Sequence, residues 1–234
     1  MNIYASAIQD ALKLLVVGDA TVWPVILLSL SVSGSAVAIA MLVGVPLGYS
    51  LGMSRFAGRG LISILVNTGM GFPPVVVGLF VYMALSHSGP FGPFGLLFTA
   101  PGMIIAQVIL ALPLVVGVTS AAIAAVPRDM RLQLRALGAS RLQEGIAVLR
   151  EARGGVMVSI IAGFGAIISE VGAVSIVGGG IEGSTNVMTT AIAGNVSKGD
   201  FSRAMAWALI LIGIVIMVNI VLTTVQNTGM RYDR

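Results

Sequence analysis

The sequence predicts an all-α membrane protein with about five transmembrane helices, its N-terminus outside the cell and its C-terminus in the cytoplasm. Of the 234 residues, 57% are apolar and only 9% are charged, whereas a soluble domain carries about 25% charged residues. The mean hydropathy of +1.02 agrees with this balance. Because so few charges cannot cover a surface that faces water, most of the chain is expected to face lipid.

Residues 1–20 form the first element of the chain. They lack the basic start and the continuous apolar core of a cleaved signal peptide. Ile3, Ile8, Leu12 and Leu15 recur near helical spacing, which favours an amphipathic segment on the membrane surface. A frayed terminus explains the same residues equally well. Residues 21–234 contain no linker and are expected to form a single transmembrane domain.

Five later stretches are long and apolar enough to cross a membrane, which takes about 20 residues per helix. Pro73 and Pro74 interrupt the second stretch, and Glu170 is the one acidic residue inside a predicted span. The odd number of spans argues against an inverted-repeat transporter made from one chain. The stretches are residues 24–49, 61–85, 101–125, 156–177 and 204–225.

The basic residues set the orientation of these spans, because cytoplasmic loops are enriched in Lys and Arg. Ten of the 13 basic residues fall in loop 52–60, in loop 127–155 or in the C-terminal tail, which all lie on one side of the predicted bundle. Only Lys13, Lys198 and Arg203 lie on the other side. Loop 127–155 is therefore cytoplasmic.

Several functional classes are excluded by composition. The chain has no cysteine and a single histidine, His87, which leaves no thiolate or histidine-rich metal site. It contains neither a phosphate-binding Walker pattern nor a nucleophile–base constellation. We therefore expect no enzyme activity and no bound metal or cofactor. The net charge of +4 does not indicate nucleic acid, because the positive residues lie at helix ends.

Loop 127–155 is too polar to span and is patterned as two helices. Gly138 suits the position just after a helix end. Ser140 then begins a second helix, with Gln143 three residues on as its capping partner. Leu142, Ile146 and Leu149 give that helix one apolar face. Such helices can lie on the lipid surface or insert into a groove on a soluble partner. The sharp turn at Gly138 favours a partner, because helices that only anchor to a lipid surface do not need a tight turn between them.

The run from Arg135 to Ser140, Arg-Ala-Leu-Gly-Ala-Ser, resembles the centre of the cytoplasmic EAA loop of ABC importer membrane subunits. This sequence departs from the family at both ends. Leu132, Gln133 and Leu134 replace Glu-Ala-Ala, and Val148 with Arg150-Glu151 replaces Ile-x-Leu-Pro. The resemblance implies docking on an ABC ATPase dimer without the usual acidic anchor, through Arg135, Ala136, Leu137, Gly138, Ala139, Ser140 and Arg141.

Other runs resemble the tungstate-type permeases, which belong with the molybdate and sulfate importers. They are residues 71–78, 169–172 and 177–183, followed by Thr185 and residues 188–192. The resemblance implies a type I ABC importer permease in a bacterial or archaeal cytoplasmic (inner) membrane. An external binding protein would deliver a tetrahedral oxyanion, tungstate foremost, and ATP with Mg²⁺ would be held by the ATPase. Molybdate and sulfate permeases are alternatives, as are an ion-coupled secondary transporter and a channel.

Two helix-breaking or charged features within the spans are candidate gate elements. Pro73 and Pro74 remove backbone donors in mid-helix, which lets a helix bend around a pathway or pack statically against a neighbour. Glu170 lies past the midplane toward the outside, and a carboxylate is a poor ligand for a dianion. We expect it to gate the path or to tie helices together by a hydrogen bond.

An oxyanion is held by hydrogen-bond donors more than by positive charge. Hydroxyl and amide side chains near the outer mouth are therefore candidate pathway residues, although each is equally suited to a helix cap or an interhelical bond. They are Ser169, Ser184, Thr185, Asn186, Thr189 and Thr190. Because five helices are few for a complete pathway, we also predict a homodimer with the path at its two-fold axis.

Overall fold

The computed structural model describes residues 22–54 and 56–231, and every regular element in these ranges is helical. The predicted all-α fold is confirmed, whereas the predicted surface segment 1–20 lies outside the described residues. The elements are α2 (Val22–Met53), α3 (Arg59–Met70), α4 (Pro74–Leu85), the short 3-10 helix η1 (Gly92–Phe94), α5 (Ala100–Ala124), α6 (Arg128–Ala136), α7 (Arg141–Glu151), α8 (Arg153–Ile168), α9 (Gly172–Gly178), α10 (Met188–Ser197) and α11 (Phe201–Arg231).

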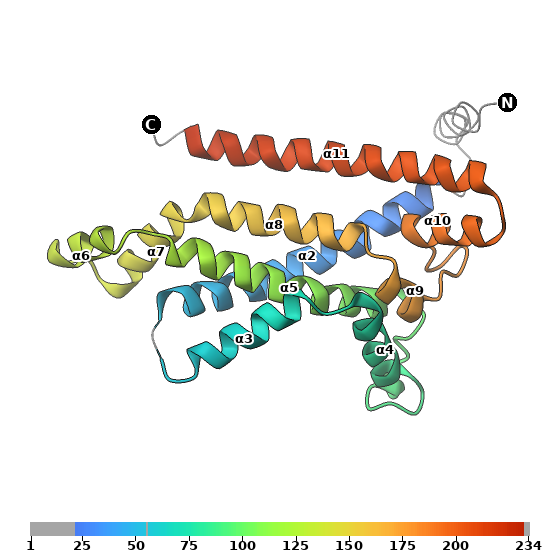
Figure 1. Cartoon of the computed structure of the whole chain (residues 1–234), viewed down its shortest axis with the longest axis horizontal. Coiled ribbons are helices and arrows are strands. Elements are labelled where there is room, and N and C mark those ends of the chain that lie inside the picture. Colours follow the sequence, from blue (N-terminus) through green and yellow to red (C-terminus); the bar gives the residue numbers. More distant parts are fainter. Residues whose placement is uncertain (1–21, 55, 232–234) are drawn as a thin grey trace.

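The long helices α2, α5, α8 and α11 run side by side and give the molecule two distinct ends (Figure 1). Helices α6 and α7 lie at one end, where α11 also finishes. Helices α9 and α10 lie at the opposite end, where α2 starts. Loop 127–155 and the end of α11 therefore share one side, as the distribution of basic residues predicts. We call these the cytoplasmic end and the outer end.

Three helices are long and apolar enough to cross a membrane on their own, over Val22–Met53, Ala100–Ala124 and Phe201–Thr224. Two bent helix pairs bring the possible total to five, in agreement with the predicted number. In one pair, α3 and α4 meet at 100°. Pro73 has an extended backbone and Pro74 starts α4, so the interruption expected at these two residues is confirmed.

The fourth predicted span, residues 156–177, is not one continuous helix. Helix α8 ends at Ile168 and α9 begins at Gly172. On its cytoplasmic side, α8 meets α7 at a bend of 60°. The prediction of a single continuous helix was wrong because a second helix, α9, starts inside this apolar run. The side chain of Glu170 caps that start.

The most extensive helix packing joins α2 to α5 along a row of glycines. A Cβ atom on Gly44 would lie 2.9 Å from Val115, one on Gly48 would lie 2.8 Å from Thr119, and one on Gly52 would lie 2.8 Å from Ile123. These separations leave no room for a side chain, so the two backbones approach as closely as small residues permit. We call this contact the glycine seam.

Candidate functional site

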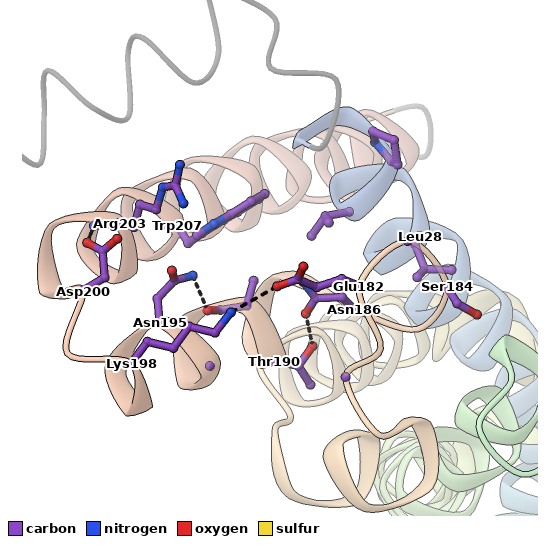
Figure 2. Close-up of a pocket in the computed structure, with 16 residues that line it drawn as sticks. Leu28, Glu182, Ser184, Asn186, Thr190, Asn195, Lys198, Asp200, Arg203 and Trp207 are labelled. Carbon is purple, nitrogen blue, oxygen red and sulfur yellow. Dashed lines mark hydrogen bonds and ion pairs between the residues drawn. The ribbon is translucent and has the colours of Figure 1, made fainter.

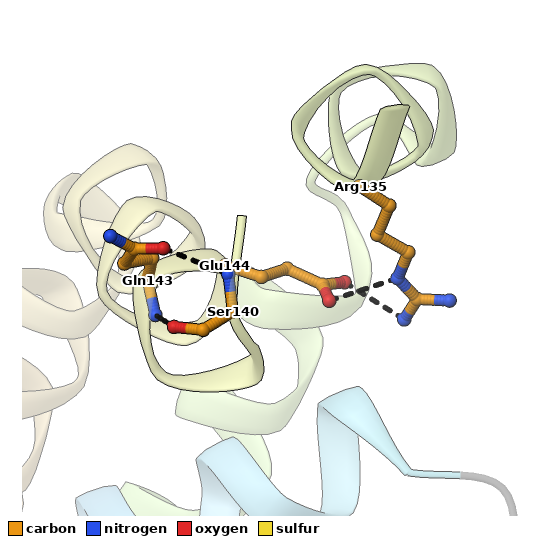
Figure 3. A network of polar contacts seen from close by, with 4 residues as sticks. All are labelled: Arg135, Ser140, Gln143 and Glu144. Carbon is orange, nitrogen blue, oxygen red and sulfur yellow. Dashed lines mark hydrogen bonds and ion pairs between the residues drawn. The ribbon is translucent and has the colours of Figure 1, made fainter. Parts of the chain in front are cut away.

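The cytoplasmic end carries the predicted helix–turn–helix. Gly138 has a φ of +80°, a left-handed conformation that glycine adopts without strain. Beyond the turn, the backbone N–H of Gln143 donates to Ser140 Oγ at 3.3 Å and the Ser140 N–H donates to Gln143 Oε1 at 2.8 Å (Figure 3). This reciprocal pair is a capping box, and it confirms the predicted start of α7.

An ion pair that the sequence reasoning missed joins the two helices of this turn. Arg135 Nε lies 2.9 Å from Glu144 Oε2, and Arg135 Nη2 lies 3.0 Å from Glu144 Oε1, as Figure 3 shows. The Glu144 side chain is only 4% exposed, whereas that of Arg135 is 63% exposed. The hydrogen bonds from Arg135 lower the pKa of the Glu144 carboxyl below its ordinary value, so it is ionised at neutral pH.

Helix α7 turns its predicted apolar face outward. Leu142 and Ile146 are exposed, whereas Glu144, Gly145 and Val148 form the buried face. The physical reason is space: a Cβ atom on Gly145 would lie within contact distance of the Tyr49 hydroxyl of α2. The glycine thus lets α7 settle on α2, and the leucines are left free at the surface.

The tip of the turn is correspondingly apolar. Leu137 is 85% exposed and Leu142 is 73% exposed. Of the predicted coupling residues, only Ala139 is partly covered, while Arg135, Ala136, Gly138, Ser140 and Arg141 are all exposed. The predicted coupling residues therefore form one accessible surface at the end of the molecule, with apolar side chains at its tip.

At the outer end, Glu170 caps a helix. Its two carboxylate oxygens accept hydrogen bonds from the backbone N–H groups of Gly172 at 2.8 Å, Ala173 at 3.0 Å and Val174 at 3.3 Å. These are the first residues of α9, whose N–H groups have no partner within the helix. Glu170 is thereby committed to starting α9.

The two helix breaks at the outer end lie against each other. A Cβ atom on Gly172 of α9 would lie 2.7 Å from the side chain of Val75, and one on Gly78 of α4 would lie 2.6 Å from the Ala173 backbone. Pro74 directly precedes Val75, and Glu170 caps Gly172. The structure thus brings the break at Pro73 and Pro74 next to the break at Glu170, which the sequence spacing alone did not predict.

The threonines of the predicted pathway set make bonds within the fold. Thr189 Oγ1 donates to the carbonyl of Glu170 at 3.0 Å. Thr185 Oγ1 accepts from the Ile181 N–H at 3.1 Å and donates to the carbonyl of Gly178. Thr190 Oγ1 accepts from the Val187 N–H at 2.9 Å. Ser169 bonds back to the carbonyl of Gly165.

A pocket of about 1020 Å³ opens at the outer end between α2, α10, α11 and the loop before α10. Ser184, Asn186 and Thr190 line it, whereas Ser169, Glu170, Thr185 and Thr189 do not. The other lining residues include Trp207, Asn195 and four charged side chains (Figure 2). Two of the charged residues, Lys198 and Glu182, form an exposed ion pair at 3.1 Å; the other two are Asp200 and Arg203.

Comparison with known proteins gives this arrangement a family. Residues 44–228 match the model for "binding-protein-dependent transport system inner membrane component". A probable anion ABC transporter permease of Haloferax volcanii is 43% identical over 82% of this chain and 84% of its own length. A tungstate uptake permease of Peptoclostridium acidaminophilum is 40% identical over 97% of this chain and 100% of its own length.

The chain is also similar to a more distant permease and to a solved transporter structure. A molybdenum transport permease of Azotobacter vinelandii is 27% identical over 81% of this chain and 88% of its own length. The fold matches a chain of the MetNI methionine ABC transporter in an inward-facing conformation, with a TM-score of 0.74 and 14% identity. That match covers 89% of this chain and 96% of the other.

Proposed function

Since the chain belongs to the family of inner membrane components of binding-protein-dependent transport systems, we propose that it carries tungstate into the cell as the transmembrane subunit of an ATP-driven importer. It is a multi-pass protein of the cytoplasmic membrane and part of an ABC oxyanion importer. The choice of tungstate as the substrate rests on the similarity to a tungstate uptake permease, which is 40% identical over 97% of this chain.

ATP is hydrolysed on a separate ATPase subunit, which the coupling turn contacts. The accessible tip at Leu137 and Leu142 supports this assignment, because an exposed apolar tip suits a groove on a soluble partner better than water. ATP binding closes the ATPase dimer, draws the turns together and opens the path outward. Hydrolysis then resets the path toward the cytoplasm.

Two copies of the chain form the transporter, with the path at their two-fold axis. Helix α3 has no buried residue, and Phe80 on α4 is 67% exposed. Because α4 meets α3 at 100°, the pair does not cross a bilayer as one straight span. A second copy covers these apolar faces and places the paired breaks of α4 and α9 beside the path.

An external binding protein selects the anion and delivers it to the outer end. The hydroxyl and amide groups that line the outer pocket supply donors without a fixed excess of positive charge, because Lys198 and Arg203 are balanced by Glu182 and Asp200. Such a surface releases an oxyanion easily, which is what a transport path requires.

An ion-coupled transporter is the weaker alternative, because it needs a membrane carboxylate that is free to exchange protons. Both oxygens of Glu170 instead accept backbone hydrogen bonds. Molybdate or sulfate import differs from the proposal only in the anion, so the same experiment separates the three substrates.

The test is reconstitution of the permease with its ATPase and binding protein in liposomes. We expect uptake of labelled tungstate that requires ATP and a catalytically active ATPase. Excess unlabelled molybdate or sulfate should inhibit this uptake less than excess unlabelled tungstate does. Uptake that continues without ATP would overturn the importer assignment. Preferred uptake of molybdate or sulfate would overturn the substrate alone.

A further inference from the structure

Helix α6 has few attachments to the rest of the molecule. Within the described part of the chain, none of its residues is buried. The turn that follows it begins with Leu137, which is 85% exposed, more than any other large apolar side chain in the described part of the chain. Met130, near the start of α6, packs partly buried against the cluster of Ile123 and Val148. Because no α6 residue is fully buried, polar contacts are needed to fix the rest of the helix.

Two arginines on one face of α6 make those contacts. Arg131 Nη2 donates to the carbonyl of Ile123 in α5 at 2.5 Å. Arg135, one turn further on, makes its two bonds to Glu144 in α7. One arginine thus fastens the start of α6 to the bundle, and the other fastens its end to the second helix of the turn.

Glu144 is the immobile partner in this contact, because α7 holds it in a buried position. It lies on the buried face of α7, next to Gly145, which sits against Tyr49, and one turn before the fully buried Val148. The Arg135 side chain, in contrast, is mostly exposed and reaches across the turn from α6. A two-pronged guanidinium–carboxylate contact restricts angle as well as distance, so it sets how α6 lies on α7.

We infer that the Arg135–Glu144 pair is a clasp that holds the coupling turn in one shape, so that motion of the ATPase reaches the transmembrane helices. Both residues act as positioning residues. This inference rests on the proposed function. Glu144, one of the acidic residues of loop 127–155, thereby serves an intrachain contact in a loop that has Leu132 at the position of the family's acid.

The chemical alternative is that Glu144 pairs with a basic residue of the ATPase once the complex forms. The two explanations differ in what reversing the charges does. If the clasp is intrachain, R135E/E144R restores the contact. If the acid is needed by the partner, the reversed pair leaves the partner's cation unpaired and places an arginine opposite it.

The absence of cysteine from the chain makes a direct measurement simple. Spin labels on cysteines introduced at Leu132 and Ile146, both exposed, report the α6–α7 distance in nanodiscs without the ATPase. Coupling is measured separately on unlabelled protein, as tungstate transported per ATP hydrolysed. The variants are R135Q, E144Q, the reversed pair and R128Q. Arg128 is the matched control, an exposed arginine on α6 with no side-chain partner among the described residues.

We expect R135Q and E144Q to broaden the distance distribution and to lower transport per ATP by up to roughly fivefold, the upper end of the range for a single accessible ion pair. R128Q should resemble the wild type, and the reversed pair should restore both readouts. Unchanged distributions in R135Q, or a reversed pair that fails to restore transport per ATP, would overturn the clasp. If the wild type itself shows no ATP-driven uptake, the proposed function fails, while the distances still decide the clasp.

Discussion

The outer and cytoplasmic ends of the molecule hold their polar residues in different ways. At the outer end, side chains bond to the backbone: Glu170 accepts from three N–H groups of α9, and Thr189 donates to a carbonyl. At the cytoplasmic end, Arg131 and the Ser140 capping box also bond to the backbone, but α6 is joined to α7 by a pair of side chains, Arg135 and Glu144. Backbone-directed bonds fix the course of the chain, whereas a side-chain pair can open without unfolding a helix.

This difference separates architecture from coupling. Substitutions at the outer end should lower stability first, and substitutions at the cytoplasmic end should lower coupling first.

The largest expected effect is that of Glu170→Ala. It leaves three backbone N–H groups of α9 without their acceptor, and loss of a helix cap costs about 1–2 kcal/mol. The free energy of unfolding, measured by denaturant titration in detergent, should fall by roughly that amount. Ser169→Ala is the matched control, because Ser169 is exposed and bonds only within its own turn. Equal unfolding curves for the two variants would contradict the capping role.

Gly138→Val should uncouple the ATPase while leaving the membrane fold in place. At a φ of +80°, a left-handed residue with a β-branched side chain is strained by roughly 1–2 kcal/mol, which reshapes the turn. Binding-protein-stimulated ATP hydrolysis should fall, although the variant should still insert in the membrane. Gly138→Asn, which tolerates this conformation, should retain most of the activity. Undiminished stimulation in the valine variant would refute the role assigned to the turn.

Thr189→Val should have a smaller effect on the outer end. It removes one hydrogen bond, to the carbonyl of Glu170, and a typical bond contributes about 1 kcal/mol. The same denaturant titration should show a shift below that of Glu170→Ala. Ser184→Ala, at an exposed pocket residue, provides the comparison. A larger loss for Thr189→Val than for Glu170→Ala would reverse the order proposed for this end.

The smallest effect is expected from acid. The pKa of Glu144 lies below its ordinary value of 4.5, chiefly through the hydrogen bond with Arg135 and also through the charges of Arg131 and Arg141. A lowered pKa means that the clasp stabilises the turn above pH 4.5 and weakens as pH falls through the folded-state pKa. The α6–α7 distance distribution should therefore stay constant from pH 7 to 5 and broaden below 4.5. In Glu144→Gln, the distance distribution should no longer change with pH. If it still broadened below pH 4.5, the broadening would belong to another titrating group.

Local signals in the sequence were sufficient for much of the fold. The bend at Pro73 follows from the missing N–H, and the start of α7 follows from Ser140 and Gln143, because these effects act within four residues. The break at Glu170 also has a local cause, but it lies inside an apolar run long enough to span, and length dominated the prediction. The run's acidic residue before Gly172 was the available signal.

The contacts that were missed join residues whose relative position depends on packing. Arg135 and Glu144 are nine residues apart across a turn, and the angle of that turn depends on how Gly145 fits against Tyr49. The outer pocket is lined by residues of α2, α10 and α11. The sequence therefore identified Ser184 and Asn186 as possible donors, but it could not predict that they line one pocket. The α4–α9 contact is of the same kind.

The glycine seam gives the protein a mechanical property. Because α2 presents no side chain at Gly44, Gly48 and Gly52, the side chains of α5 pack directly on its backbone, and there is little slack between the two helices. Helix α5 has 25 residues, or roughly 38 Å at the helical rise, and it leads through Pro127 into α6. A tilt of about 5° at its cytoplasmic end would displace the outer end by roughly 3 Å over that length. If the proposed ATPase displaces the coupling turn, this pair of helices would act as a lever arm and would enlarge a small displacement at one end of the molecule into a larger one at the other.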